Sequence, residues 1–285
     1  MEHEKTVKKF SVRHFRAKKR KGEKIVALSL YDAPMASLAE ECGVDLLLVG
    51  DSVGMAMLGY KTTIPVTIEQ SLHHCAAVAR GAKKAFVVGD MPFMTYRPSV
   101  ELALKNAARY LQEAGVEAVK LEGGEDIAPT VARLVEAGVP VMGHVGLLPQ
   151  NILISGGYRS PADTDAELER LSRDAAALQT AGAFCIVLEC VPARIAERVS
   201  AQLEIPTIGI GSGPGCDGQI QVVHDILGLL PGFTPRHAKM YVNLSTLIAD
   251  AFKTYAREVE GKDFPDPGNY SSGGAGMPPN QGDTP

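Results

Sequence analysis

EAGVEAVKLEGGEDIAPTVARLVEAGVPVMGHVG, residues 113–146, is the stretch that decides the fold, because it contains a strand, a helix and a second strand in order. Residues 118–121 and 139–142 are short, largely apolar runs of the kind found in strands that are buried on both faces. Residues 127–137 have a helical pattern, and Gly138 stands where that helix should end, because glycine readily takes the left-handed cap conformation. This order predicts a right-handed unit with two parallel strands.

The same alternation continues on both sides of this unit. For an eighth strand we favour residues 219–223, with residues 238–242 as the second choice. Strands that alternate with helices in this way predict an α/β protein, a (β/α)8 TIM barrel. The other strands are expected at 25–30, 46–49, 85–88, 184–188 and 207–210, and the other helices at 33–41, 68–81, 100–114, 165–181 and 193–202.

The two ends of the chain differ from the repeating part. Residues 12–21 predict an extra helix before the first strand, which could plug the bottom of the barrel, and a last helix is expected at 244–258. Pro, Gly, Ser and Asn dominate after that helix, and such a segment has too little apolar surface to fold alone. We therefore expect a flexible N-terminus (1–10), one catalytic barrel domain (11–261) and a disordered tail (262–285).

Composition excludes several classes of protein. The chain has 285 residues, 45% of them hydrophobic, and a formal net charge of -4 with both signs interspersed, so neither a nucleic-acid partner nor a membrane partner is expected. It has no apolar stretch of about 18 residues and no sign of a signal peptide. The five cysteines show no CxxC spacing, which favours free thiols in a reducing compartment. These features predict a cytoplasmic protein.

Ionisable side chains stand at or just after the carboxyl ends of the predicted strands, where such a barrel carries its chemistry. A single acid there is readily explained as a turn residue or helix cap, and for Asp51 or Asp90 alone that explanation would be preferred. Four carboxylates aimed into one bowl would repel one another, however, and would need a cation or a proton. Besides Asp32, which follows the first strand, the side chains are Asp51, Asp90, Lys120, Glu122, His144 and Glu189, four of them carboxylates.

Three of these acids, Asp51, Asp90 and Glu122, suit a hard divalent ion, and oxygen ligands select Mg²⁺ over softer metals. Lys120 is two residues from Glu122 on one strand, so the two side chains share a face. Lys120 would then lie beside the metal and pair with a substrate carboxylate. The alternative is a structural ion pair with a neighbouring acid.

Glu189 and His144 are the candidates for proton transfer. Glu189 follows a very apolar strand, a setting that increases the basicity of a carboxylate and suits a general base. Alternatively, Glu189 could be an ion-pair partner that supports the site without contacting the substrate. His144 could support the reaction by donating to a substrate or metal-bound oxygen, or could equally be a satisfied polar residue at the barrel rim.

The motifs that carry these residues resemble those of the ketopantoate hydroxymethyltransferase family. The resemblance covers roughly residues 15–260 in unbroken order, and six ordered motifs are a specific signal. They are LVGDSVGM from Leu48, DMPFM from Asp90, VKLEGG from Val119, GHVGL from Gly143, LECVP from Leu188 and IGIGSG from Ile208.

The resemblance implies transfer of a hydroxymethyl group from 5,10-methylenetetrahydrofolate to 3-methyl-2-oxobutanoate. The products would be 2-dehydropantoate, on the route to pantothenate, and tetrahydrofolate. It implies Asp51, Asp90 and Glu122 as Mg²⁺ ligands and Glu189 as the proton acceptor. The family is typically a homodecamer of two stacked pentameric rings. The residues that the resemblance assigns to the 2-oxo acid are Asp51, Ser52, Asp90 and Lys120.

Two other functions compete with this one. A Mg²⁺-dependent carbon–carbon lyase or mutase of the isocitrate-lyase type would also use a barrel and enolate chemistry. Such enzymes commonly carry a reactive loop cysteine, and neither Cys75 nor Cys216 has a comparable local signature. A non-catalytic binding or scaffold barrel would not need four carboxylates and a lysine at one rim.

Overall fold

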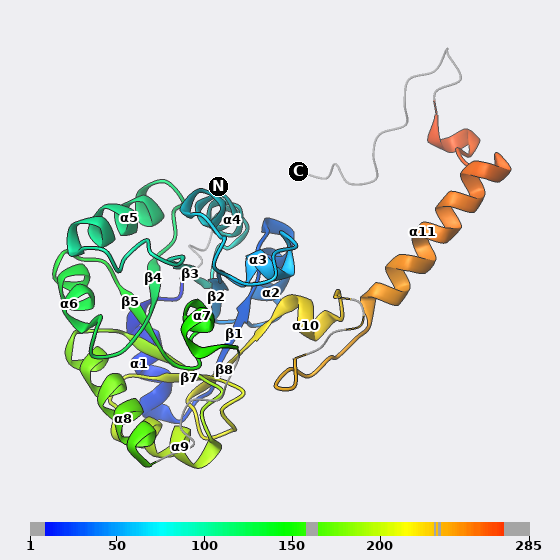
Figure 1. Ribbon diagram of the computed structural model, residues 1–285. Helices are drawn as coiled ribbons and strands as arrows, with labels where there is room; N and C mark the ends of the chain where they lie inside the picture. The colour runs from blue at the N-terminus through cyan, green and yellow to red at the C-terminus, as the bar shows by residue number, and fades with distance from the viewer. Residues whose placement is uncertain (1–8, 158–164, 231, 233–234, 271–285) are drawn as a thin grey trace, which may run out of the picture.

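The fold is a closed barrel of eight parallel strands, which confirms the predicted (β/α)8 architecture (Figure 1). The computed structural model describes residues 9–157, 165–230, 232 and 235–270. Each strand pairs with its neighbours in chain order, and β8 returns to pair with β1. The strands are β1 (Ile25–Ser29), β2 (Leu46–Val49), β3 (Phe86–Asp90), β4 (Ala118–Glu122), β5 (Val141–Gly146), β6 (Cys185–Glu189), β7 (Thr207–Ile210) and β8 (Gly218–Val222).

Helices surround the barrel and bury its outer apolar side chains in the larger of two core clusters. The helices expected between strands are present, with ends that differ by one or two residues where they differ at all. The helical elements are α1 (Val12–Lys21), α2 (Ala33–Glu41), α3 (Val53–Ala56), α4 (Ile68–Gly81), α5 (Val100–Gln112), α6 (Ala128–Glu136), η1 (Pro149–Asn151), α7 (Ile152–Ser155), α8 (Asp165–Thr180), α9 (Ala193–Gln202), α10 (Val223–Leu227), α11 (Leu244–Gly261) and η2 (Pro267–Asn269).

The extra helix α1 closes the amino-terminal end of the barrel, as predicted. Its Phe15 is fully buried and its ring lies against those of Phe86 on β3 and Phe184 beside β6. These rings belong to the second core cluster, which fills the inside of the barrel with side chains from several strands. The barrel is therefore packed at the bottom, and its open end is the end where the strands finish.

The eighth strand is the favoured one, β8, and residues 238–242 form no strand. Two expected boundaries were wrong in a way that matters for the site. β3 extends to Asp90, and β5 begins at Val141 and runs to Gly146, so Asp90 and His144 lie within strands. Pro140 precedes β5, and proline cannot donate a ladder hydrogen bond within a sheet. The apolar run alone placed β5 two residues too early.

Helix α11 leaves the barrel and extends away from it (Figure 1). None of its side chains is buried, although Leu247, Phe252 and Tyr255 are large apolar residues. No helix that the structure describes combines the length and apolar character that crossing a membrane requires. The division into a flexible start, one catalytic domain and a disordered tail stays a prediction, and residues 1–8 and 271–285 lie outside the described part.

Candidate active site

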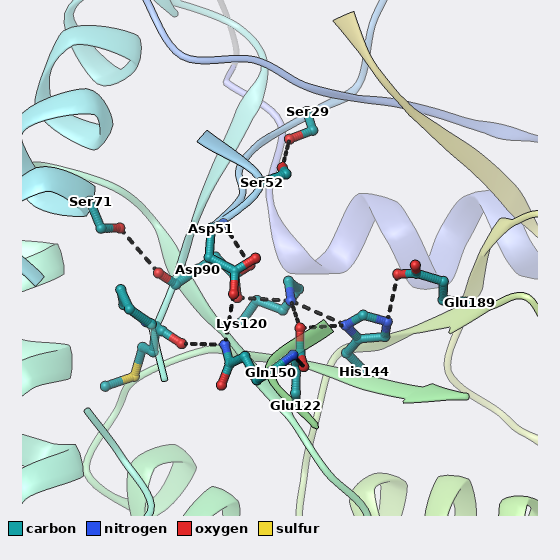
Figure 2. A network of polar contacts seen from close by, with 12 residues as sticks. Ser29, Asp51, Ser52, Ser71, Asp90, Lys120, Glu122, His144, Gln150 and Glu189 are labelled. Atoms are coloured by element: carbon teal, nitrogen blue, oxygen red, sulfur yellow. Dashed lines mark hydrogen bonds and ion pairs between the residues drawn. The ribbon is translucent and has the colours of Figure 1, made fainter. Parts of the chain in front are cut away.

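Strand pairing brings the predicted site residues together at the carboxyl end of the barrel. Asp90 on β3 is in register with Lys120 on β4, and Glu122 on β4 is in register with His144 on β5. Asp51 follows β2 after a single glycine, and its backbone N–H donates to Asp90 Oδ2 at 3.1 Å. Figure 2 shows these side chains directed toward one another in one network.

The three acids predicted as metal ligands form one buried cluster. Asp51, Asp90 and Glu122 each offer an oxygen, and these oxygens all lie within 4.8 Å of one another. Apart from ion pairs, Asp90 Oδ1 and Glu122 Oε1 have no hydrogen-bond partner among the described residues. Three buried carboxylates this close together repel one another unless cations or protons balance their charge. The donor set, oxygen atoms on converging carboxylates, therefore fits a hard divalent ion.

Burial and the neighbouring negative charges raise the pKa of two of the three carboxylates, Asp51 and Asp90. Burial, followed by the negative charges of Asp90 and Glu122, raises the pKa of Asp51 well above its ordinary value. Burial also raises the pKa of Asp90, and the opposing effect of Lys120 is too small to cancel it. Asp51 and Asp90 therefore hold protons more tightly than free carboxyl groups do, and a metal ion that bound here would displace those protons.

Lys120 is the ammonium within this cluster. Its Nζ lies 2.8 Å from Asp90 Oδ1 and 3.5 Å from Glu122 Oε1. Burial alone would lower the pKa of Lys120, but the neighbouring carboxylates outweigh burial and raise it, so Lys120 is charged. Burial would likewise raise the pKa of Glu122, yet Lys120 and His144 bring that pKa to about 2. The ion pair proposed as an alternative role for Lys120 is therefore present, and it leaves the ammonium beside the carboxylates.

His144 joins the acid cluster to Glu189. Its Nδ1 lies 3.2 Å from Lys120 Nζ and 3.4 Å from Glu122 Oε1, and its Nε2 lies 3.2 Å from Glu189 Oε2. Burial and Lys120 lower the pKa of His144, but contacts with Glu122 and Glu189 raise it to about 9. With its pKa raised to about 9 the ring is charged and carries a proton on each nitrogen, and Nε2 forms an ion pair with Glu189. His144 is thus not a rim residue apart from the cluster.

Glu189 ends β6 and is fixed by its backbone. Its carbonyl oxygen accepts from Leu147 N–H at 2.9 Å, and it is in register with Gly146 on β5. Gly146 has φ of 101°, and a Cβ there would stand 2.4 Å from the Glu189 carbonyl oxygen. Only glycine suits such a contact. The Glu189 side chain is partly exposed and lies beyond His144 from the three acids (Figure 2); its role as a base stays a prediction.

Ser52 lies on the opposite side of Asp51 from Gln150 (Figure 2). Its hydroxyl is 2.8 Å from the Tyr31 hydroxyl and 3.4 Å from the Ser29 hydroxyl. The structure therefore places Ser52 next to the acid cluster, within a small group of hydroxyls. Its assignment to substrate binding stays a prediction.

Sequence reasoning missed several residues that build the site. Gln150 in η1 is 2% exposed and contacts both Asp51 and Glu122. The Tyr96 hydroxyl accepts from the Glu122 N–H at 3.1 Å, and Arg97 donates to the Glu122 carbonyl at 2.8 Å. All three lie in loops after strands, with no periodicity or motif to mark them. A signal was available only in their position after β3 and β5, where a barrel assembles its site.

Solved structures of other proteins share this fold. The chain resembles phosphonopyruvate hydrolase in complex with oxalate and Mg²⁺, with a TM-score of 0.60 at 14% identity over 91% of this chain and 93% of that one. It also resembles 2,3-dimethylmalate lyase, with a TM-score of 0.56 at 15% identity over 92% and 91% of the two chains. At this identity the likeness concerns the barrel alone.

Relatives in sequence are much closer. A 3-methyl-2-oxobutanoate hydroxymethyltransferase from Syntrophus aciditrophicus is 53% identical over 91% of this chain and 95% of its own length. One from Gluconacetobacter diazotrophicus is 55% identical over 87% and 90%. The sequence model of the ketopantoate hydroxymethyltransferase family matches residues 9–267. The chain that carries this cluster of acids therefore belongs to the ketopantoate hydroxymethyltransferase family.

Proposed function

We propose that this chain transfers a hydroxymethyl group from 5,10-methylenetetrahydrofolate to 3-methyl-2-oxobutanoate, giving 2-dehydropantoate and tetrahydrofolate. Relatives about half identical in sequence carry the name of this activity. The observation that carries the proposal is the buried cluster of Asp51, Asp90 and Glu122 around Lys120 at the open end of the barrel. Such a cluster suits a 2-oxo acid, which presents a keto oxygen and a carboxylate side by side.

Mg²⁺ is the proposed cofactor, held by Asp51, Asp90 and Glu122. When bound, it would act as a Lewis acid that favours the enolate of the 2-oxo acid. Lys120 would hold the negative end of the substrate by charge, since its ammonium stays protonated among the acids. Ser52, next to Asp51, would offer a hydroxyl to the same substrate. Burial of the cluster would exclude water and strengthen each of these contacts.

Glu189 is the proposed proton acceptor, and His144 would orient it. The reaction must remove a weakly acidic proton from C3 of the substrate, and a carboxylate at the end of β6 faces the same bowl as the acids. His144 Nε2–H would keep one Glu189 oxygen in place while the other takes the proton. The resulting carbon nucleophile would form a bond to the methylene carbon of the folate co-substrate. One molecule of water would supply the hydroxyl oxygen of the transferred hydroxymethyl group, and tetrahydrofolate would be released.

The lyase or mutase alternative rests on the barrel alone, because the relevant solved structures are at most 17% identical to this chain. Cys75 and Cys216, the cysteines considered for such chemistry, are both buried. Burial raises the pKa of each thiol, which makes a thiolate less accessible. The sequence relatives support the transferase.

The test is turnover of 3-methyl-2-oxobutanoate with Mg²⁺, with and without the folate co-substrate. Formation of 2-dehydropantoate only when folate is present supports the transferase. Without folate, wild-type protein should still exchange the C3 proton for deuterium from D₂O, followed by proton NMR. Cleavage of a 2-oxo or hydroxy diacid in place of this transfer would overturn the proposal in favour of the lyase.

We propose further that the chain works as a homo-oligomer, with the decamer of its family as the expected form. Two surfaces support self-association. Helix α11 carries an apolar stripe, which includes Leu247, Phe252 and Tyr255, and none of its residues is buried. The paired residues Val26 on β1 and Gln219 on β8 are exposed on the barrel wall. Unlike β2, β3, β4 and β7, whose residues are all buried, β1 and β8 lack full cover. Each copy thus has an uncovered wall and an unpartnered helix.

Light scattering tests this association. Phe252→Glu should reduce the oligomer, because a charge would enter the apolar stripe; Lys253→Glu, on the opposite side of the same helix, should not. An unchanged mass for Phe252→Glu would remove α11 from the interface. The five free cysteines are consistent with a cytoplasmic location, which we propose for this biosynthetic activity.

A further inference from the structure

Gln150 contacts two of the three acids, Asp51 and Glu122, and two neighbouring groups. Its backbone N–H donates to Glu122 Oε2 at 3.1 Å, and its side-chain Nε2 donates to Asp51 Oδ2 at 3.1 Å. Nε2 also donates to the Met91 carbonyl at 3.0 Å, and Oε1 lies 2.9 Å from the Tyr96 hydroxyl. One residue in η1 therefore reaches Asp51, which follows β2, and Glu122, which ends β4 (Figure 2).

The orientation of the Gln150 amide is determined by its neighbours. Asp51 Oδ2 and the Met91 carbonyl both accept, so the end that faces them must be the NH₂ group. A flipped amide would place its oxygen against a carboxylate and a carbonyl, which costs the desolvation of unpaired buried groups. The Tyr96 hydroxyl is in place to donate to the other end. The side chain is thus held in one position.

Lys120 and Gln150 each contact two of the three acids, and only Lys120 is charged. Lys120 pairs with Asp90 and Glu122 and neutralises part of their charge. Gln150 links Asp51 to Glu122 with neutral donors, so it fixes the positions of two carboxylates and leaves their negative charge available. Outer residues that orient ligands in this way typically affect metal affinity about 10–100-fold.

We infer that Gln150 is a positioning residue that holds Asp51 and Glu122 in the arrangement needed to bind a divalent cation. This inference rests on the proposed metal site. Gln150 would leave the chemistry to the acids and to Glu189. Because Gln150 would already hold the carboxylates in position, metal binding would require less reorganisation of their side chains.

Isothermal titration calorimetry of Mg²⁺ with the full chain tests the inference. Gln150→Met keeps the length of the side chain, removes the amide contacts with Asp51, the Met91 carbonyl and Tyr96, and leaves the backbone N–H contact with Glu122 in place. It should raise the Kd for Mg²⁺ about 10–100-fold, because Asp51 loses its donor. Gln179→Met is the matched control. Gln179 also holds backbone with its amide, accepting from Glu204 N–H at 2.7 Å and Ile205 N–H at 3.2 Å, but it lies outside the site. This control should bind Mg²⁺ like wild type.

Gln150→Leu provides a second variant if Gln150→Met folds poorly. It also removes the amide and leaves the backbone N–H contact with Glu122, and it should weaken Mg²⁺ binding to a similar extent. A Kd within about twofold of wild type in either well-folded variant overturns the positioning role, since a merely structural residue lowers the unfolding temperature without changing the Kd. Wild-type protein that binds no Mg²⁺ would instead overturn the proposed metal site, and with it the role of Gln150.

Discussion

Replacing Lys120 by Met measures how strongly the acid cluster depends on its buried cation. The substitution keeps the length of the side chain and removes the ammonium that lies 2.8 Å from Asp90 Oδ1 and 3.5 Å from Glu122 Oε1. All three side chains are almost fully buried. Removing one partner of a buried ion pair costs about 3–5 kcal/mol, because the other charge is left without compensation.

This cost converts to a thermal shift. One kcal/mol moves the Tm of a protein near this size by about 2–4 °C, so metal-free Lys120→Met should unfold about 6–20 °C below wild type. The lower part of that range is expected, because Asp90 has a raised pKa and can take up a proton when the ammonium is gone. Mg²⁺ should recover much of the loss, because the variant cluster is more negative and binds a cation at least as well.

Differential scanning calorimetry with and without Mg²⁺ is the assay, and Lys18→Met is the control. Lys18 Nζ lies 2.5 Å from Asp45 Oδ2, but this pair is partly exposed and should contribute at most about 1 kcal/mol. A metal-free Lys120→Met protein with a Tm within about 2 °C of wild type would refute the electrostatic account. A loss of stability that Mg²⁺ does not reduce would show that Lys120 acts by packing.

The remaining predictions concern the base, the pH dependence and the backbone. Glu189→Gln should lose roughly 10²–10⁴-fold in C3 deuterium exchange while Mg²⁺ binding persists, and undiminished exchange would exclude Glu189 as the base. Because burial and the neighbouring acids raise the pKa of Asp51 in the folded state, its ionisation lowers metal-free stability as pH rises above the unfolded value. Scanning fluorimetry should therefore show a larger stabilisation by Mg²⁺ at mildly alkaline than at mildly acidic pH; a constant shift would contradict this. Gly146→Ala would set a methyl group against the Glu189 carbonyl at positive φ, so turnover should fall while calorimetric Mg²⁺ affinity stays near wild type, and unchanged turnover would contradict the proposed positioning.

The parts of the site that could be predicted from the sequence follow from strand periodicity. Lys120 and Glu122 share a face because side chains alternate along a strand, and Asp90 lies level with them because parallel strands end together. The link from Glu122 through His144 to Glu189 needs the register of β4, β5 and β6, which an apolar run does not specify. The apolar run that includes Pro140 placed β5 two residues too early, so it did not indicate that His144 lies within the strand.

Other parts depend on contacts that no local pattern encodes. Gln150 reaches the acids because the loop after β5 turns back over the barrel in η1, and glutamine in a loop carries no signal of its own. Helix α11 was expected from its apolar spacing, and the helix is present. The same spacing suits a helix packed on its own barrel and one packed on another copy. The structure shows α11 extending away from the barrel with none of its residues buried, a position that the spacing does not indicate.

The charge of the cluster connects stability to function. Three buried carboxylates lie around one ammonium, and folding alone does not relieve their mutual repulsion, which together with burial raises the pKa of Asp51 and Asp90. A second lysine in place of Gln150 would relieve the repulsion and stabilise the empty protein, but it would also remove the negative charge that attracts a divalent ion. A neutral amide holds the carboxylates together at the expense of metal-free stability. The binding of a cation then restores that stability, and by linkage the same free energy determines how tightly the cation is held.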